Sequence, residues 1–174
     1  MPIIPFKDWR PKIHEDIFLA PDAWITGNVT IEKDVSIFFG VVIRGDILPI
    51  KIGEGSNIQE HAMIHTSHDL SPTIVGKGVT IGHRALIHGC TIKDSCIIGM
   101  GSTILDGAEI SEHSIVGANS LVTMNKIFPP RSMIMGSPAK VVRELTDREV
   151  ESIKFSAKSY VETGKEYMKY FLTA

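Results

Sequence analysis

The stretch that decides the fold runs from Thr73 to Lys126 and divides into nine hexapeptides: TIVGKG, VTIGHR, ALIHGC, TIKDSC, IIGMGS, TILDGA, EISEHS, IVGANS and LVTMNK. Eight of the nine second positions hold branched aliphatic residues, and the fifth position is mostly a small residue. A period of six fits neither an α-helix nor an ordinary amphipathic strand. It is typical of a triangular coil with one short strand on each face and a turn at each corner.

The same period continues upstream, with two interruptions. It runs through Ile25, Ile31, Ile37 and Ile43 and resumes after a three-residue insertion around DILP. It shifts again across TSHDLSP, where the phase indicates an insertion of about four residues. We expect the aliphatic second position of each hexapeptide to point into the prism, with small residues at the corners. The sequence therefore predicts an all-β parallel β-helix over about residues 12–143.

The C-terminal segment has a different pattern. Thr146 followed by Glu149 forms a capping box, and apolar residues then recur at roughly helical spacing as far as Phe171. We expect one amphipathic helix over about residues 146–171, folded back along the prism, with Gly164 weakening its middle. The 174 residues are expected to form a single domain.

Composition excludes several classes of partner. The net charge is −2 and there is no basic run, so nucleic acid and anionic membranes are not expected partners. No apolar run is long enough to span a bilayer, and the N-terminus lacks the apolar centre of a signal peptide. We therefore expect a cytoplasmic protein in which Cys90 and Cys96, six residues apart, are reduced and serve packing.

Three of the seven histidines are related by the length of a rung, which is about 18 residues. Corrected for the insertion, His65 and His88 lie nearly over each other on adjacent rungs, whereas His83 falls toward another face. A closed ring, most simply a trimer, would bring His83 of one chain to His65 and His88 of its neighbour. Three imidazoles with an open fourth position form a catalytic zinc site, although spacing alone also allows ordinary core or interface histidines. His14 and His113 are interpreted as solvated, and His61 as structural, the alternative for His61 being a fourth metal ligand.

Five segments carry a resemblance to a known family. In this order, VIRGD, IGEGSNIQEHAMIH, VTIGHRALIHGC, IIGMGSTILDGAEI and GSPAKVVREL resemble the γ-class carbonic anhydrases, over roughly residues 10–170. The resemblance implies a left-handed parallel β-helix with a C-terminal helix, assembled as a homotrimer. It implies that His65 and His88 of one chain and His83 of the next hold Zn²⁺, or alternatively Fe²⁺ or Co²⁺. A metal-bound hydroxide at the trimer interface would then convert CO2 reversibly to bicarbonate.

The same resemblance assigns roles to three further residues near the metal. Asn57 and Gln59 of NIQ resemble family residues that orient the metal-bound water or the substrate. Tyr160 resembles a helix tyrosine that reaches the site in some members. The alternatives are a corner turn for Asn57, a solvated face for Gln59 and helix packing for Tyr160.

The interface is expected to depend on three charged residues. Arg44 and Asp46 of RGD resemble the interface ion-pair residues of the family. Glu60 stands where the family usually has aspartate, and its longer side chain is expected to pair with Arg44 across the interface.

The loop after the first ligand departs from the best-known active members, which carry an acidic loop there. Its titratable groups are His68 and Asp69. His68 is a candidate proton shuttle because histidine titrates near neutral pH, the alternative being a solvated loop residue. The short loop favours modest turnover.

Two rival functions come from other classes. Hexapeptide β-helices also include acyltransferases, in which one histidine acts as general base and CoA lies between neighbouring prisms. GSPAKVV occurs in those proteins as well, but a single catalytic histidine leaves the other two unexplained. The second rival is a non-catalytic metal-binding trimer that serves as a scaffold.

Overall fold

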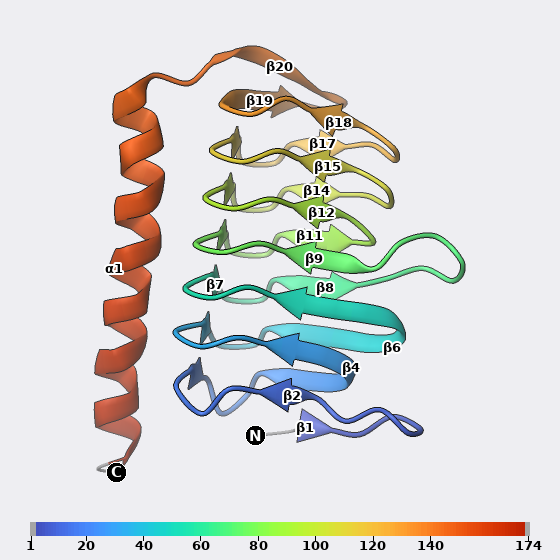
Figure 1. Cartoon of the computed structure of the whole chain (residues 1–174), viewed down its shortest axis with the longest axis vertical. Coiled ribbons are helices and arrows are strands. Elements are labelled where there is room, and N and C mark those ends of the chain that lie inside the picture. Colours follow the sequence, from blue (N-terminus) through green and yellow to red (C-terminus); the bar gives the residue numbers. More distant parts are fainter. Residues whose placement is uncertain (1–2, 173–174) are drawn as a thin grey trace.

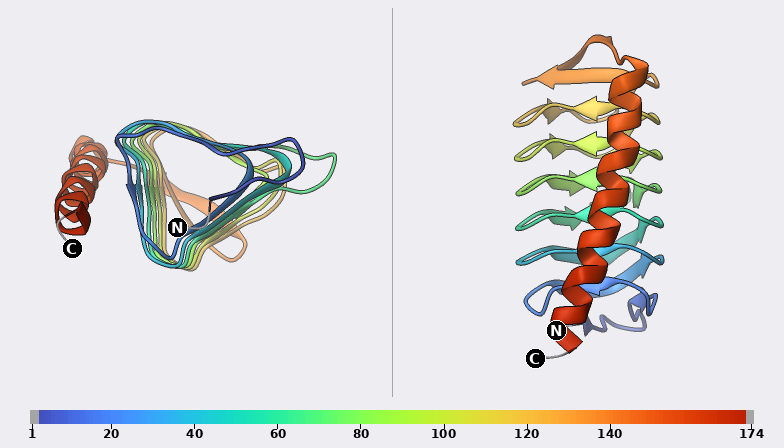
Figure 2. Two further views of the ribbon diagram at one scale, coloured as in Figure 1. Left: turned by 90° about the horizontal axis from the view of Figure 1, so that it is seen from below. Right: turned by 90° about the vertical axis from the view of Figure 1, so that its left-hand side faces the viewer.

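The computed structural model describes residues 3–172, which form a left-handed parallel β-helix flanked by one α-helix (Figure 1). As the chain rises in Figure 1, the strands in front run toward the helix and those behind run away from it, which is the left-handed sense. The predicted fold class is confirmed. Seen along its axis, the coil is a triangle and the helix lies beside one of its sides (Figure 2).

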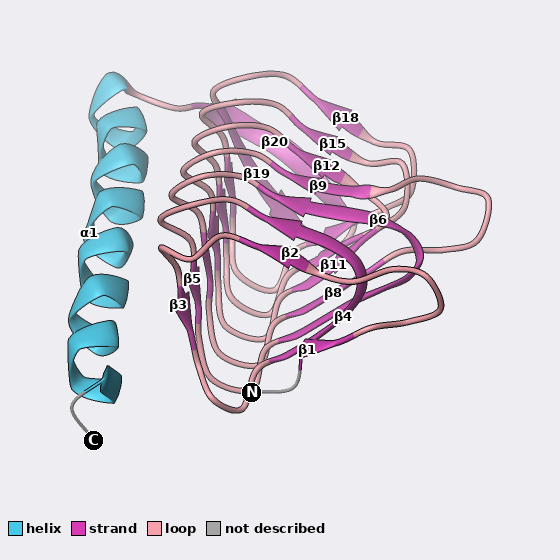
Figure 3. Cartoon of the chain, turned by 60° about the horizontal axis from the view of Figure 1, so that its bottom comes forward, coloured by secondary structure: helices cyan, strands magenta, loops and turns pink. Residues whose placement is uncertain are grey.

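Each turn of the coil contributes strands to three faces (Figure 3). Face 1 contains β1 (Ile3–Ile4), the first parts of β4 (Trp24–Ile31) and β6 (Val42–Ile52), β8 (Met63–His65), β11 (Leu86–His88), β14 (Thr103–Ile104) and β17 (Leu121–Val122). Face 2 contains β2 (Lys12–Ile13), the second parts of β4 and β6, β9 (Thr73–Val75), β12 (Thr91–Ile92), β15 (Glu109–Ile110) and β18 (Ile127–Phe128). Face 3 contains β3 (Phe18–Leu19), β5 (Ser36–Ile37), β7 (Asn57–Ile58), β10 (Thr80–Ile81), β13 (Ile97–Ile98), β16 (Ile115–Val116) and β19 (Ser132–Gly136), and β20 (Ala139–Glu144) pairs antiparallel to β19.

Three ladders of aliphatic side chains fill the prism, because the strands pair in parallel register and equivalent residues stack. These side chains are almost completely buried, and each contributes about 1.5–3 kcal/mol relative to an exposed one. The face 1 ladder is Ile25, Ile43, Ile64, Ile87, Ile104 and Val122. The face 2 ladder is Ile31, Ile52, Val75, Ile92, Ile110 and Phe128. The face 3 ladder is Ile37, Ile58, Ile81, Ile98, Val116 and Ile134.

The predicted phase was wrong between Thr73 and Thr91. Here the third position of the hexapeptide points inward: Ile87 is 0% exposed, whereas Ile74 at the predicted inward position is 38% exposed. The phase changes because the next inward residue along the chain, Ile92, comes five positions after Ile87 instead of six. The insertion after His65 is also longer than inferred. It adds five residues, instead of about four, to the usual spacing between the inward residues of face 1 and face 2.

The corners of the prism use left-handed backbone conformations. The residue three positions before each inward aliphatic has φ between about +50° and +70° at most corners, a region that glycine, asparagine, aspartate and histidine occupy more readily than other residues. His61 and His113 occupy such corners, with φ values of 60° and 58°. The corner position agrees with the structural interpretation of His61, whereas His113, which was expected to be solvated, is only partly exposed.

The C-terminal helix α1 (Asp147–Leu172) lies along face 3 and runs back toward the N-terminal end (Figure 2). The capping box is present: the Glu149 backbone N–H donates to Thr146 Oγ1 at 3.3 Å, and the Thr146 N–H donates to Glu149 Oε2 at 2.9 Å. Gly164 was expected only to weaken the helix, but it is required for packing, because a Cβ atom there would collide with the side chains of Ser36 and Phe18. The glycine therefore permits close approach of the helix to face 3. Within residues 3–172, no helix has the length and apolar character needed to cross a membrane.

The two cysteines are core residues at equivalent positions, as predicted. Each lies two residues before an inward isoleucine, and Cys90 and Cys96 are 1% and 0% exposed. Burial raises the pKa of each thiol to about 12, so the reactive thiolate is scarce at neutral pH. We expect a thiol reagent to leave both unmodified in the native protein and to titrate both after unfolding in guanidinium. Rapid modification of native protein would contradict this packing role.

Candidate active site

The predicted site residues divide between two corners at opposite edges of face 1. Corner A lies where face 1 meets face 2, and corner B lies where face 3 meets face 1. Corner A holds Arg44, Asp46, His65, His88 and Asp106. Corner B holds Gln59, Glu60 and His83, and Asn57 lies beside it at the start of β7 on face 3.

His65 and His88 stack at corner A. They end β8 and β11, and the parallel register places them directly opposite each other on adjacent rungs, as predicted. His65 Nδ1 lies 3.1 Å from His88 Nε2. His65 is 9% exposed, so the pair lies at the base of the corner and not at its tip.

The outer nitrogen of each imidazole faces a carboxylate. His65 Nε2 lies 3.0 Å from Asp46 Oδ1, and His88 Nδ1 lies 3.0 Å from Asp106 Oδ2. A carboxylate in this position fixes the tautomer and orientation of a metal-binding histidine and leaves its other nitrogen free. Two nitrogens bound to one tetrahedral Zn²⁺ at about 2.0–2.1 Å lie about 3.3 Å apart. The facing nitrogens of His65 and His88 therefore fit two positions of such a site.

Arg44 and Asp46 form an ion pair within the chain and contact His65. Arg44 Nη1 donates to Asp46 Oδ2 at 2.6 Å, and Arg44 Nη2 lies 3.3 Å from His65 Nδ1. Burial raises the pKa of Asp46, but hydrogen bonds from His65 and Arg44 outweigh it and lower the pKa overall. Burial, aided by the charge of Arg44, lowers the pKa of His65 despite its hydrogen bond to Asp46. The lowered pKa favours the neutral imidazole, which is the form that binds a metal.

His83 lies at corner B, away from the other two histidines. Its Nδ1 is 2.6 Å from Glu60 Oε2 on the rung below, and its side chain is 45% exposed. Glu60 therefore contacts His83 within the chain, while Arg44, its expected partner across an interface, lies at corner A. Among residues 3–172, no three histidine, cysteine or acidic residues gather in a metal-binding group, because the three histidines divide between the two corners.

Asn57 and Gln59 form a buried chain of hydrogen bonds at corner B. They are 1% and 5% exposed, which excludes the solvated-face alternative for Gln59 and, since Asn57 begins β7, the turn alternative for Asn57. Gln59 Nε2 donates to Asn57 Oδ1 at 3.3 Å, and Asn57 Nδ2 donates to Thr80 Oγ1 at 2.9 Å. The Gln59 amide is therefore held in one orientation.

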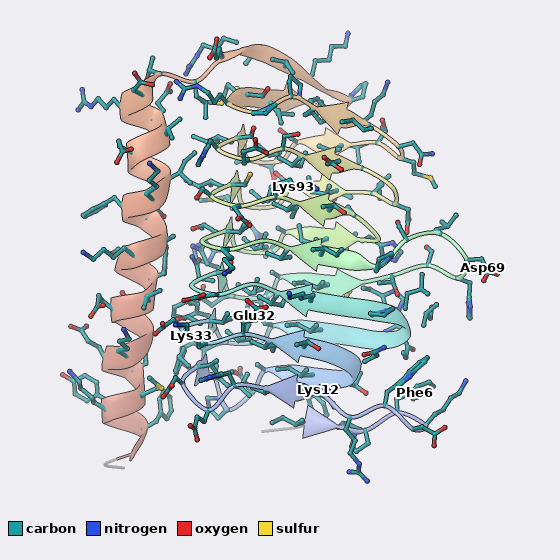
Figure 4. The ribbon with its side chains drawn as sticks, in the orientation of Figure 1. Phe6, Lys12, Glu32, Lys33, Asp69 and Lys93 are labelled. Atoms are coloured by element: carbon teal, nitrogen blue, oxygen red, sulfur yellow. The ribbon has the colours of Figure 1, made fainter. Side chains whose placement is uncertain are left out.

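Tyr160 and His68 lie at the margins of these corners. The ring of Tyr160 packs edge-on against Phe38, with ring centroids 5.8 Å apart, and Phe38 lies one rung below Gln59. His68 is exposed on the loop over residues 66–72, which projects from the coil (Figure 1) and whose tip carries Asp69 (Figure 4).

The structure adds Asp106 and Thr73 to the residues that contact the histidine segments. Asp106 holds the His88 ring, and the Thr73 hydroxyl donates to the His65 carbonyl at 2.6 Å. Thr73 lies outside the five segments that resemble the family, and Asp106 lies within IIGMGSTILDGAEI without a role assigned to it, so neither residue was singled out from the sequence. Their positions follow from the register between rungs.

Comparisons with known proteins give a consistent assignment of family. Residues 89–123 match the family "Bacterial transferase hexapeptide (six repeats)". The chain is 43% identical over 159 residues to gamma carbonic anhydrase 2, mitochondrial, of Arabidopsis thaliana, covering 88% of this chain and 57% of that protein. It is 43% identical over 165 residues to the carbonic anhydrase of Geobacillus kaustophilus, covering 95% of this chain and 90% of that protein.

One solved structure has the same fold as this chain, but its name differs from those of the carbonic anhydrases. A Bacillus cereus protein that carries an acetyltransferase name is 43% identical, with a TM-score of 0.94 and coverage of 97% of both chains. The similarity to these two named carbonic anhydrases covers 88% and 95% of this chain. The chain belongs to the γ carbonic anhydrase family of hexapeptide-repeat proteins.

Proposed function

We propose that the protein is a metal-dependent carbonic anhydrase that reversibly hydrates CO2, with each active site shared between two chains of a homotrimer. One observation carries the proposal: the facing nitrogens of His65 and His88 are 3.1 Å apart, and each ring is backed by a carboxylate. A pair of histidines serving only packing needs neither the convergence nor the two acids. The relatives named carbonic anhydrase support the same reading.

The third ligand would come from a neighbouring chain. His83 lies at the far edge of face 1 from His65 and His88, so one chain cannot complete the site. A cyclic trimer that packs corner B of one chain against corner A of the next would bring the three imidazoles together. The same packing would bring Gln59 and Asn57 to the site.

The outer surface of face 1 supports this mode of association. Outward positions on successive strands form a strip, apolar except for one threonine, whose members include Trp24 and Met63, which are 51% and 47% exposed. Face 3 is covered by α1, and the outer surface of face 2 carries charged side chains, among them Lys12 and Lys93 (Figure 4). An exposed apolar strip of this kind marks an association surface. The face 1 strip consists of Trp24, Val42, Met63, Leu86, Thr103 and Leu121.

The residues of the chain would bind the metal and orient the reactants. His65, His88 and the neighbour's His83 would hold Zn²⁺, Fe²⁺ or Co²⁺, which when bound lowers the pKa of a coordinated water toward ~7. The Gln59 amide, fixed through Asn57 and Thr80, would present hydrogen-bonding groups to the attacking water or to bicarbonate. His68, exposed on the adjacent loop, would pass the released proton to solvent.

The proposal is tested by metal content and activity together. We expect protein purified without added metal to contain one metal per chain by mass spectrometry and to hydrate CO2. Chelation is expected to remove both, and Zn²⁺, Fe²⁺ or Co²⁺ to restore both. Protein that binds no metal even after Zn²⁺ is supplied would contradict the proposal.

Acyl transfer is the second candidate, because the similar Bacillus cereus protein carries an acetyltransferase name. It needs one histidine as general base and leaves the His65–His88 pair unexplained. Binding of CoA by metal-free protein would favour it. A trimer that holds metal but hydrates no CO2 would instead indicate the metal-binding scaffold.

A further inference from the structure

The segments that carry His65 and His88 are joined by a buried threonine that no motif of the family resemblance includes. Thr73 begins β9, directly after the loop that follows His65, and is 0% exposed. In the parallel register it lies in an inward column above Val29 and Ile50, both 1% exposed. A hydroxyl in an aliphatic column is unfavourable unless it is hydrogen-bonded, so this position calls for a specific pair of partners.

Both partners of Thr73 belong to the histidine segments. Its Oγ1 donates to the His65 carbonyl oxygen at 2.6 Å and accepts from the Gly89 backbone N–H at 2.9 Å. The same N–H lies 3.1 Å from the His65 carbonyl. Thr73 therefore links the backbone at one histidine to the residue that follows the other. Ser71, in the loop just before Thr73, makes a similar link. Its hydroxyl donates to the Gly89 carbonyl and accepts from the Gly107 N–H at 3.1 Å.

Asp106 fixes the ring of His88. Its two carboxylate oxygens lie 3.2 and 3.0 Å from His88 Nδ1, and the residue is 7% exposed. Gly89 makes room for it: φ at Gly89 is +54°, and a Cβ atom there would collide with Asp106 Oδ1. The missing side chain at Gly89 thus lets the carboxylate reach the ring and turn Nε2 toward His65.

We propose that Thr73 and Asp106 are positioning residues that set the separation and orientation of His65 and His88. Thr73 fixes the two backbones relative to each other, and Asp106 fixes the His88 ring. The inference rests on the proposed metal site. It predicts that removing either contact weakens metal binding without touching a metal ligand, because hydrogen-bonding partners of ligands typically account for about 10–100-fold in metal affinity.

The test uses the full-length trimer with Thr73→Val and Asp106→Asn, which keep side-chain shape, and Thr73→Ser, which restores a hydroxyl. Zn²⁺ affinity is measured by chelator competition, and the coordination geometry by the visible absorption spectrum of bound Co²⁺. We expect Thr73→Val and Asp106→Asn to weaken Zn²⁺ binding about 10–100-fold and to alter the Co²⁺ spectrum. Thr73→Ser is expected to bind nearly as wild type.

Ser114→Ala is the matched control for a purely structural loss. Ser114 is also 0% exposed, and its hydroxyl also accepts a backbone N–H from the next rung, that of Ser132 at 3.1 Å. It lies on the face 3 side, away from both histidines, so we expect reduced stability with unchanged Zn²⁺ affinity and Co²⁺ spectrum. If Thr73→Val and Asp106→Asn trimers bind Zn²⁺ as wild type does, the positioning role is wrong while the metal site stands. Wild-type protein that binds no metal would overturn the proposed function, and this inference with it.

Discussion

Replacing His83 with alanine is expected to abolish metal binding and CO2 hydration while leaving the fold and the trimer intact. The side chain is 45% exposed and its polar contact within the chain is with Glu60, so its removal is expected to change stability little. The site, however, would lose one of its three imidazoles. Mass spectrometry measures the metal bound per chain, and gel filtration shows whether the trimer forms. Stopped-flow kinetics measure CO2 hydration.

Mixed trimers show whether the site is shared. His83→Ala chains keep an intact corner A, and His65→Ala chains keep an intact corner B. Each variant alone is expected to bind no metal. After the two are unfolded together and refolded, some interfaces pair the intact corners, and we expect metal and activity to return in part. Full metal occupancy in His83→Ala trimers would show that the shared-site proposal is wrong.

Introducing a lysine at Met63 is expected to dissociate the trimer and, with it, to empty the metal site. Met63 is 47% exposed on the face 1 strip in the single chain, so a lysine there is tolerated by the monomer. In the assembled trimer the same charge would be buried without a partner, which costs about 3–5 kcal/mol. This corresponds to a weakening of association between about 100-fold and several thousand-fold. Analytical ultracentrifugation measures the change, and circular dichroism checks that the monomer stays folded.

Ile127→Lys is the matched control on the neighbouring face. Ile127 is an outward, apolar strand residue on face 2 and is 73% exposed. If the trimer forms through face 1, this lysine stays in solvent and the assembly is unchanged. If Ile127→Lys dissociates the trimer while Met63→Lys remains trimeric, the interface lies on face 2. Corner A of one chain would then not meet corner B of the next, and the shared-site proposal would be wrong.

The repeat itself made the architecture predictable. A period of six repeated along most of the chain leaves few arrangements that bury every aliphatic residue, so the β-helix follows from the pattern. The helix start was equally local, because the capping box of Thr146 and Glu149 forms within one turn. The stacking of His65 on His88 followed from the length of a rung, and their register confirms it.

The phase between Thr73 and Thr91 could not be read from the sequence. Two neighbouring aliphatic residues, such as Ile74 and Val75 or Leu86 and Ile87, satisfy the same pattern, and either member of each pair can point inward. Only pairing with the rungs above and below decides between them, since a shift of one residue reverses every side chain. Likewise, the length of the inserted loop follows from the register of the strands on either side and not from the composition of the loop.

The sequence by itself determined the coil, the helix and the alignment of two histidines, because each depends on spacing along one chain. The tertiary structure decided which groups meet across rungs. It placed Asp106 against His88 and Thr73 between His65 and Gly89, contacts between residues 8 to 18 positions apart in the chain. It also separated His83 from the other two histidines by the width of face 1. These contacts depend on three-dimensional register and on the length of each turn, which hydrophobic periodicity does not encode.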